Sequence, residues 1–361
     1  MNDPTLRVGV IGVGWAGQQH LAAYRALPDV EIVAIAGKER ELLDSLGEEY
    51  GAALLFENWE ELLEAPGLDA VSIAVPTFLH APIAIAALKR GLHVLSEKPL
   101  ARNAVEGQQM VDTARAAGRV LDVVFNHRLR GDIQALAGII HRGELGRAYY
   151  AKASWMRRRG IPSLGSWFTN QEMSGGGPLA DIGVHVLDYA LFLLGEPRVT
   201  SVNAVTYSEL GPRNIGETKA GDKTGTDSKF EVEDFAAAFI RLEGGGTLAL
   251  ETSWAAFRSP TDLIDFSVLG TEGGAELKAV GATKAVVGDL HVYRDVDGEI
   301  ADYTPTAEPG LAHAGVVENF VRVLRTPAEW TANDGSLALK RARVIDACYQ
   351  SAAEKREITV E

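Results

Sequence analysis

The sequence contains a single cysteine and no long apolar run. Cys348 is the only cysteine among 361 residues, so no intrachain disulfide can form, and its helical surroundings predict a packing role rather than a nucleophile. No apolar run approaches the roughly 20 residues that a membrane helix needs. The stretch MNDPTLRVGVIGVG carries an early acid and lacks the basic flank and cleavage site of a secretory signal. We therefore expect a cytoplasmic protein.

Positive charge is scarce relative to negative charge. The chain has 35 Lys and Arg against 49 Asp and Glu, which gives a net charge of -14 at pH 7. This acidity argues against a nucleic-acid-binding surface and against an anionic membrane as partner. Apolar residues, in contrast, make up 46% of the chain, which at this length is enough for a real core and favours two domains.

The first part of the chain alternates short apolar runs with helical patterns. Apolar runs of this kind, separated by helices, predict a parallel sheet that is covered on both faces. The expected strands between residue 6 and about residue 125 are LRVGVIGVG, VEIVAIAG, ALLF, LDAVSIAVP, LHVLSEKP and VLDVVFNHR.

Beyond Arg128 the expected strands become longer and alternate apolar with polar residues. Short glycine turns such as EGGG and TEGG join them, which is typical of antiparallel pairing. One long helix, from about Pro178 to Leu194, interrupts the strands, and residues 211–230 are expected to form a polar surface loop. Two helical patterns, AGVVENFVRVLR and GSLALKRARVIDACYQSA, close the chain.

Gly12, Gly14 and Gly17 form a G-x-G-x-x-G pattern directly after the first strand and at the start of a helix, with Trp15 and Ala16 between them. Glycines there permit a tight turn and bring a pyrophosphate close to the helix N-terminus. We therefore predict an α/β protein with an N-terminal Rossmann dinucleotide-binding domain. Its expected bounds are residues 1–126, and residues 127–361 are expected to form a substrate-binding and oligomerisation domain of α+β class with a large, mostly antiparallel open sheet.

The end of the second strand bears on the choice between NAD and NADP. NAD enzymes usually carry Asp or Glu there for the ribose hydroxyls, but this chain has Gly37, followed by Lys38 and Arg40. A missing carboxylate and two cations suit a 2′-phosphate, so the expected cofactor is NAD(P), with NADP slightly favoured over NAD. Two alternatives stay open: Glu39 could hold the ribose from a shifted register, or these charged residues are a solvated helix start.

Three segments resemble the Gfo/Idh/MocA oxidoreductase family, which is named after glucose–fructose oxidoreductase and inositol dehydrogenase. They are GVIGVGWAGQQH, VPTFLHAPIAIAALKRGLHVLSEKPLA and SGGGPLADIGVHVLDYALFLLG, and the resemblance covers almost the whole chain. It implies that Lys98 of the E-K-P motif projects toward the nicotinamide and the substrate, with Glu97 beside it. It also implies that a D-x-x-x-H pair, Asp181 and His185, completes the site.

The positions of these residues fit that chemistry. Lys98 follows a strand at the sheet edge where ligands of parallel sheets bind, and it could stabilise developing alkoxide charge. Asp181 and His185 are four residues apart on one helix face, where neutral His185 can accept the alcohol proton and Asp181 can orient it or the substrate. The alternatives are a strand-end ion pair of Lys98 with Glu97 and a packed histidine in an ordinary helix. Asp188 could join a metal site, but no fourth ligand group supports one, and no metal is expected.

Pro76, Thr77 and His80 match the family's P-N-x-x-H pattern, except that Thr replaces Asn. By resemblance they contact the nicotinamide half of the cofactor, and the departure at Thr77 leaves the amide contact open. His80 could instead cap the start of a helix.

Several polar and aromatic residues are candidates for substrate recognition. Asn126 and Arg128 lie at the domain junction, where the family often has substrate contacts. Trp155 and Arg157 fall on one face of a predicted strand, and Trp167 could stack on a sugar ring. Any of these side chains could instead lie at a subunit interface.

These features predict an NAD(P)-dependent oxidoreductase that transfers a hydride between a nicotinamide and a secondary alcohol of a sugar, glycoside, inositol or related polyol. Two other classes stay open: an NAD(P)-binding regulator or sensor without turnover, and a glycoside-cleaving enzyme that uses NAD transiently. Apolar residues on both faces of the second sheet predict a homodimer or homotetramer through that sheet.

Overall fold

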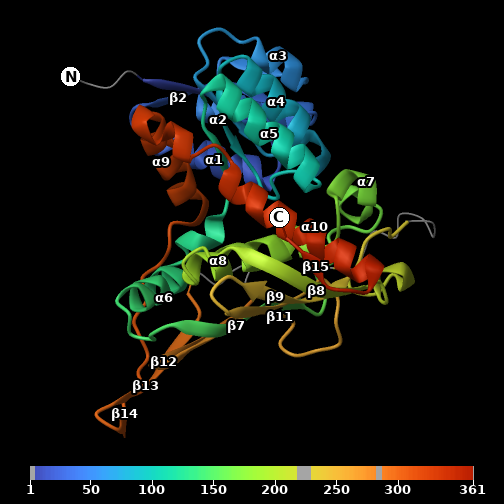
Figure 1. Ribbon diagram of the computed structural model, residues 1–361. Helices are drawn as coiled ribbons and strands as arrows, with labels where there is room; N and C mark the ends of the chain where they lie inside the picture. Colours follow the sequence, from blue (N-terminus) through green and yellow to red (C-terminus); the bar gives the residue numbers. More distant parts are fainter. Residues whose placement is uncertain (1–4, 218–228, 282–286, 361) are drawn as a thin grey trace. The chain divides into compact units, whose positions relative to one another are not determined.

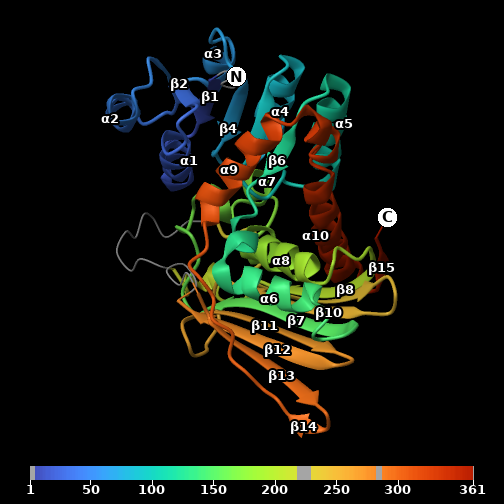
Figure 2. The ribbon, with the colours of Figure 1, turned by 90° about the vertical axis from the view of Figure 1, so that its left-hand side faces the viewer.

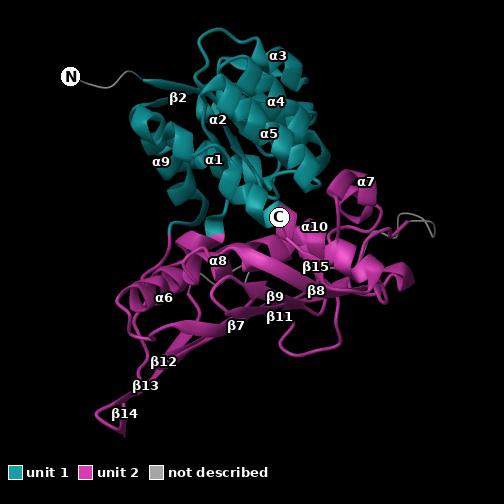
Figure 3. Cartoon of the chain, viewed as in Figure 1, with its two compact units in different colours: residues 1–126, 311–342 teal, residues 127–310, 343–361 magenta. Residues whose placement is uncertain are grey.

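The structure is a computed structural model that describes residues 5–217, 229–281 and 287–360. The chain divides into two compact units (Figure 3): unit 1 contains residues 1–126 and 311–342, and unit 2 contains residues 127–310 and 343–361. The sequence prediction assigned residues 311–342 to the second domain, whereas the structure groups them with unit 1. Much of the polar loop expected at 211–230 lies outside the described residues.

Unit 1 is built on a parallel sheet whose described strands follow the order β3-β2-β1-β4-β5-β6, which confirms the predicted Rossmann arrangement. Helices cover both faces of the sheet (Figure 2). The central strands β1, β4 and β5 accordingly consist mostly of buried residues. The chain order reverses between β1 and β4, the point where ligands bind outside the carboxyl ends of such strands. The strands are β1 (Leu6–Ile11), β2 (Val30–Ala36), β3 (Leu54–Phe56), β4 (Ala70–Ile73), β5 (His93–Ser96) and β6 (Leu121–Val123).

The helices between these strands form two layers. Figure 2 shows α1 and α2 on one side of the sheet and α4 and α5 on the other. Asn103 caps α5 by accepting a hydrogen bond from the Glu106 amide, a favourable start for a helix. The helices are α1 (Trp15–Arg25), α2 (Arg40–Tyr50), α3 (Trp59–Leu63), α4 (His80–Lys89) and α5 (Ala104–Ala117).

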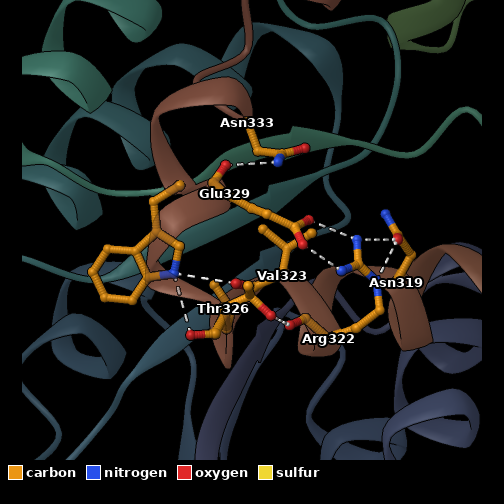
Figure 4. A network of polar contacts seen from close by, with 8 residues as sticks. Asn319, Arg322, Val323, Thr326, Glu329 and Asn333 are labelled. Atoms are coloured by element: carbon orange, nitrogen blue, oxygen red, sulfur yellow. Dashed lines mark hydrogen bonds and ion pairs between the residues drawn. The ribbon is translucent and has the colours of Figure 1, made fainter.

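Unit 1 is completed by a segment from the C-terminal part of the chain. Helix α9 (Ala312–Leu324) packs on α1, and a 3₁₀ turn over Pro327–Ala332 follows it. Figure 4 shows how side chains fix this turn, with Arg322 paired to Glu329 at 2.9 Å. Residues 311–342 are thus a structured part of unit 1.

The same segment covers an edge of the parallel sheet. The amide of Leu121 in β6 donates to the carbonyl of Asn333 at 2.9 Å, and Arg115 in α5 pairs with Asp334 at 2.6 Å. A Cβ at Gly335 would lie 2.7 Å from a methyl group of Leu121, so glycine allows this close approach. Helix α10 (Ser336–Glu354) begins immediately afterwards.

Unit 2 is built on a mixed, mostly antiparallel sheet whose described strands follow the order β14-β13-β12-β11-β7-β10-β9-β8-β15. Strands β7 and β10 pair in parallel, and the other strand pairs are antiparallel. The strands are β7 (Ala148–Arg157), β8 (Val199–Tyr207), β9 (Phe235–Leu242), β10 (Thr247–Ser253), β11 (Asp262–Gly270), β12 (Gly273–Val280), β13 (Asp289–Val296), β14 (Glu299–Ile300) and β15 (Ile358–Thr359). This confirms the predicted α+β class of the second half.

Helices lie on one face of this sheet. Figures 1 and 2 show α6 (Gly131–His141) and α8 (Val184–Leu193) on the same side of it. A short helix, α7 (Gln171–Ser174), lies earlier in the chain. The strand residues alternate accordingly: Ala236, Ala238 and Ile240 of β9 are buried, whereas Phe239 between them is 44% exposed.

Two further observations concern the composition. Cys348 is fully buried in α10, and burial raises the pKa of its thiol to about 12, as expected for a packing residue. Across the described stretches of the chain, no helix combines the length and apolar character needed to cross a membrane.

Candidate active site

The glycine loop at the end of β1 has the shape of a phosphate cradle. Gly12 has a φ of +106°, and a Cβ there would lie 2.0 Å from the carbonyl oxygen of Ala74, so only glycine fits. A Cβ at Gly17 would lie 1.9 Å from the Gly12 carbonyl oxygen, so this glycine lets α1 pack against the loop. At Gly14, in contrast, no described atom lies within 4 Å of a Cβ.

The three glycines therefore shape the loop and leave its middle open at the start of α1. The helix begins at Trp15, and no side-chain hydrogen bond from its N-cap, Gly14, satisfies the first amides. Backbone amides and a helix dipole aimed at open space suit the pyrophosphate of a dinucleotide. The residues present thus fit the predicted cofactor.

The residues after β2 have partners that the sequence did not indicate. A Cβ at Gly37 would lie 2.6 Å from both methyl groups of Val13, so the phosphate loop itself requires glycine at this position. Lys38 Nζ donates to Asn58 Oδ1 at 2.6 Å. Arg40 pairs with Asp44 at 2.7 Å, and this hydrogen bond raises the pKa of the exposed guanidinium.

His80 braces two loops at the carboxyl ends of the strands. Its Nδ1 lies 2.8 Å from the carbonyl oxygen of Pro99, and its Nε2 lies 2.9 Å from that of Val75. Burial lowers the pKa of His80, and the two carbonyls oppose this only in part. The imidazole therefore joins the loop of Pro76 and Thr77 to the turn that carries Lys98, and the contacts involve both of its nitrogens.

Glu97 lies in a buried cluster of its own. Its Oε1 lies 3.2 Å from Nε2 of His20 in α1 and 3.4 Å from Nε2 of His313 in α9. Asn126 Nδ2 lies 3.2 Å from Nδ1 of His313, and the Trp15 ring meets the same imidazole edge-on. Burial favours a higher pKa for Glu97, but the hydrogen bonds from His20 and His313 outweigh it and hold the pKa well below its ordinary range.

This cluster gives Glu97 partners from two helices of unit 1. Its carboxylate ties together α1, the turn after β5 and α9, and Lys98 follows it directly in the chain. The sequence patterns do not indicate His20 or His313 as partners of Glu97. His20 lies on the buried face of α1, which is a weak signal, and nothing in the local sequence around His313 points to a residue so far away in the chain.

In unit 2, Asp181 lies in a widened helical turn that leads into the helix of His185. Residues Leu179–Gly183 form a π-helical turn, and α8 follows from Val184. Such turns are rare and occur often at functional sites. Asp181 Oδ2 accepts a hydrogen bond from Nε1 of Trp254 at 3.0 Å, and Trp254 is fully buried. Trp254, like His20 and His313, carries no functional signal in the sequence.

His185 lies among aromatic rings. Its ring centroid is 4.5 Å from that of His127 and 6.0 Å from that of Trp155, and His127 lies 5.0 Å from Trp155. Trp155 Nε1 donates to Asp262 at 2.8 Å, and the guanidinium of Arg157 lies 4.6 Å from the centre of the Trp155 ring. The structure thus brings three of the predicted residues, His185, Trp155 and Arg157, into one cluster.

Arg128 has an environment unlike the one expected of a substrate contact. Its guanidinium pairs with buried Asp188 at 2.5 Å and with Glu196 at 3.1 Å, and it lies 5.1 Å from the centre of the Phe192 ring. These contacts connect the segment before α6 to α8 and to the turn that follows α8. They also occupy the carboxylate of Asp188, the third candidate in the metal alternative.

The remaining candidates divide between the units. Trp167 stacks on Phe168 with ring centroids 3.8 Å apart, and Phe168 meets Trp254 edge-on. Unit 1 contains Lys98 and Asn126, and unit 2 contains Arg128, Trp155, Arg157, Trp167, Asp181 and His185.

Two family models match the chain. The model described as "Oxidoreductase family, NAD-binding Rossmann fold" matches residues 6–125, and the model described as "GFO/IDH/MocA C-terminal domain" matches residues 133–276.

Curated relatives and solved structures agree with these matches. The chain is 36% identical over 302 residues to D-glucoside 3-dehydrogenase of Escherichia coli (strain K12). This match covers 83% of the chain and 82% of the relative. It is 32% identical over 286 residues to levoglucosan dehydrogenase of Pseudarthrobacter phenanthrenivorans, and the match covers 74% of this chain and 72% of that relative. A solved levoglucosan dehydrogenase in complex with NADH and levoglucosan superposes with a TM-score of 0.81 at 25% identity, covering 98% of this chain and 99% of that one.

Proposed function

This chain belongs to the Gfo/Idh/MocA oxidoreductase family, and we propose that it oxidises a secondary alcohol of a sugar, glycoside, inositol or related polyol with NAD(P). The names of the relatives, a D-glucoside 3-dehydrogenase and a levoglucosan dehydrogenase, favour a pyranose ring as the substrate. When bound, the nicotinamide supplies the hydride acceptor.

The observation that carries the proposal is the environment of Asp181 and His185. A buried indole N–H orients the Asp181 carboxylate, and aromatic rings surround His185. In our proposal neutral His185 accepts the hydroxyl proton, Asp181 orients the substrate or the imidazole, and Lys98 stabilises the developing alkoxide. A sensor without turnover would have no need of such a proton acceptor.

A substrate panel tests this function. Methyl glucosides, levoglucosan, free aldoses and myo-inositol are supplied with NAD or NADP, and formation of the reduced cofactor is followed by absorbance. We expect reduction with at least one pyranose or polyol and its loss in His185→Ala. Absence of cofactor reduction across the panel would contradict the proposal, and release of a leaving group without net cofactor reduction would indicate glycoside cleavage instead.

We infer a slight preference for NADP over NAD. Lys38 and Arg40 follow β2, and the partners that they have, Asn58 and Asp44, are near the surface. Exposed pairs contribute about 0–1 kcal/mol, so a 2′-phosphate can compete with them. Dissociation constants from NADH and NADPH fluorescence test this in wild type, in Lys38→Ala and in Lys89→Ala as a control. If wild type binds NAD at least about tenfold more tightly, a difference of about 1.4 kcal/mol, the preference is wrong and Glu39 is the residue expected to hold the ribose.

We also propose a homodimer or homotetramer formed through the sheet of unit 2. Val205, Tyr207 and Phe239 are each more than two fifths exposed, and they alternate with buried residues on β8 and β9. Neighbouring aromatic and branched side chains on an exposed sheet face mark a surface that another copy can cover. Light scattering at micromolar concentration tests this, and a monomeric mass would contradict it. A cytoplasmic location stays a prediction from the acidic composition.

A further inference from the structure

The segment SGGGPLADIGVH contains three consecutive glycines, and cofactor binding gives no reason for them. They precede the π-helical turn Leu179–Gly183, in which Asp181 lies. The first amides of a helix have no partners within the helix and need acceptors from elsewhere. The structure shows which side chain accepts them.

A buried carboxylate, that of Glu233, accepts hydrogen bonds from the start of this turn. Its Oε2 accepts from the amide of Gly177 at 2.9 Å, and its Oε1 accepts from the amide of Leu179 at 2.9 Å. The Tyr349 hydroxyl in α10 donates to the same Oε1 at 3.0 Å. Glu233 is 7% exposed, so water contributes little to its solvation and these three donors replace it.

The glycines make room for this contact. A Cβ at Gly177 would lie 2.1 Å from the carbonyl oxygen of Glu233, and a Cβ at Gly176 would lie 2.0 Å from the hydroxyl oxygen of Tyr349. Any other residue at position 176 would displace Tyr349, and any other residue at position 177 would displace Glu233. Gly176 and Gly177 are therefore explained by the approach of Tyr349 and Glu233 to the backbone, and Gly175 ends α7 with a φ of +82°.

A second set of contacts fixes the same turn from β10. The Thr252 hydroxyl donates to the carbonyl of Pro178 at 3.2 Å, and Trp254, two residues further along, donates to Asp181. The turn of Asp181 is thus fixed at its start and at its side chain.

We propose that Glu233, together with Tyr349, is a positioning residue that places Asp181 and His185 by fixing the start of their helix. The inference rests on the proposed function for the roles of Asp181 and His185. Glu233 touches no reacting atom in this proposal. Its carboxylate acts through the backbone of Gly177 and Leu179, and a shift of that backbone moves both side chains that follow.

The test compares Glu233→Gln with Glu243→Gln, a control in the turn after β9 whose exposed carboxylate pairs with Arg198. Glutamine has one acceptor oxygen in place of two, so one amide loses its partner. We expect kcat at 25 °C to fall about 10- to 100-fold, the scale of a misplaced catalytic group, with the dissociation constant of NADH within about twofold of wild type. We expect the control to match wild type.

Hydrogen exchange of the protein without cofactor gives a readout that does not depend on turnover. Peptides covering residues 174–183 should exchange at least about tenfold faster in Glu233→Gln, the loss of about 1.4 kcal/mol of protection. If Glu233→Gln does not fold, Tyr349→Phe, which removes one hydroxyl, should lower kcat about three- to tenfold, as for a single hydrogen bond.

Two results would overturn the proposal. One is unchanged exchange in residues 174–183. The other is a lower thermal midpoint with unchanged kcat, which would mean that Glu233 serves stability alone. Failure of wild type to oxidise any sugar would overturn the proposed function instead, and the exchange experiment would then still decide whether Glu233 fixes the turn.

Discussion

Replacing Glu97 with Gln is expected to destabilise unit 1 by about 3 kcal/mol at neutral pH. The carboxylate is 8% exposed and lies within 3.4 Å of Nε2 of both His20 and His313. Hydrogen bonds that involve a charged group contribute about 1.5–3 kcal/mol each, and breaking a buried pair costs about 3–5 kcal/mol. Glutamine keeps one acceptor oxygen, so we take the lower end of that range.

The same contacts make this stabilisation depend on pH. The pKa of Glu97 is lower in the folded chain because hydrogen bonds from His20 and His313 outweigh the effect of burial. A carboxyl with a lowered pKa binds fewer protons in the folded state, so its stabilisation is complete above the ordinary value of about 4.3. The stabilisation is lost as the pH falls from there toward the folded pKa. The difference in the stability of unit 1 between wild type and Glu97→Gln should therefore become smaller below about pH 4.

Hydrogen exchange of peptides from β5 and α9 measures the local opening free energy without assuming that two units unfold together. The control is Glu64→Gln, which breaks an exposed pair with Arg90 and should cost less than about 1 kcal/mol. A Glu97→Gln variant that is no less stable than this control refutes the reasoning. The reasoning is also refuted if the stability difference between Glu97→Gln and wild type stays constant down to about pH 3.

Lys98→Ala should keep the affinity for NADH and lower kcat about 10²- to 10⁴-fold. In the double variant with His185→Ala, the loss of kcat should be smaller than the two single losses combined, as steady-state kinetics would measure. A fully active Lys98→Ala enzyme would remove Lys98 from the mechanism. Trp254→Phe keeps an aromatic ring but loses the indole N–H, whose nitrogen lies 3.0 Å from Asp181 Oδ2. We expect kcat to fall about five- to tenfold, as for the loss of one hydrogen bond. An unchanged kcat would mean that Asp181 needs no such partner. Gly37→Asp should weaken NADH and NADPH alike in fluorescence titrations, because its Cβ would lie 2.6 Å from buried Val13; tighter binding of NADH would show that the loop adapts.

Local patterns were sufficient to predict much of this molecule. The glycine spacing after the first strand predicts the phosphate loop, because strand, turn and helix follow one another within a few residues. The spacing of Asp181 and His185 predicts one helix, and the structure has Asp181 in a π-helical turn that leads into the helix of His185. The sequence of β9 predicts apolar residues on both faces of the sheet, and the structure has one of these faces buried while Phe239 on the other is 44% exposed.

Partners that are distant in the chain could not be predicted in the same way. Arg128, at the domain junction, is predicted to contact the substrate, and its ion-pair partners Asp188, in α8, and Glu196, in the turn after α8, lie about sixty residues later in the chain. Gly37 looks like a missing carboxylate, although Val13 leaves no room for one. The amphipathic pattern of residues 312–324 predicts a helix but does not say on which sheet it packs.

The return of residues 311–342 to unit 1 has a consequence for synthesis on the ribosome. When residue 126 has emerged, the N-terminal sheet still lacks the segment that covers β6 and the imidazole of His313 that faces Glu97. The uncovered edge of β6 can pair with other nascent chains, and Glu97 has only one of its two histidine partners. The nucleotide-binding part is therefore expected to mature only after most of unit 2 has been translated, and a chain cut after residue 126 should need chaperones or aggregate. Gene fusions that separate the two units would have to move residues 311–342 with the first.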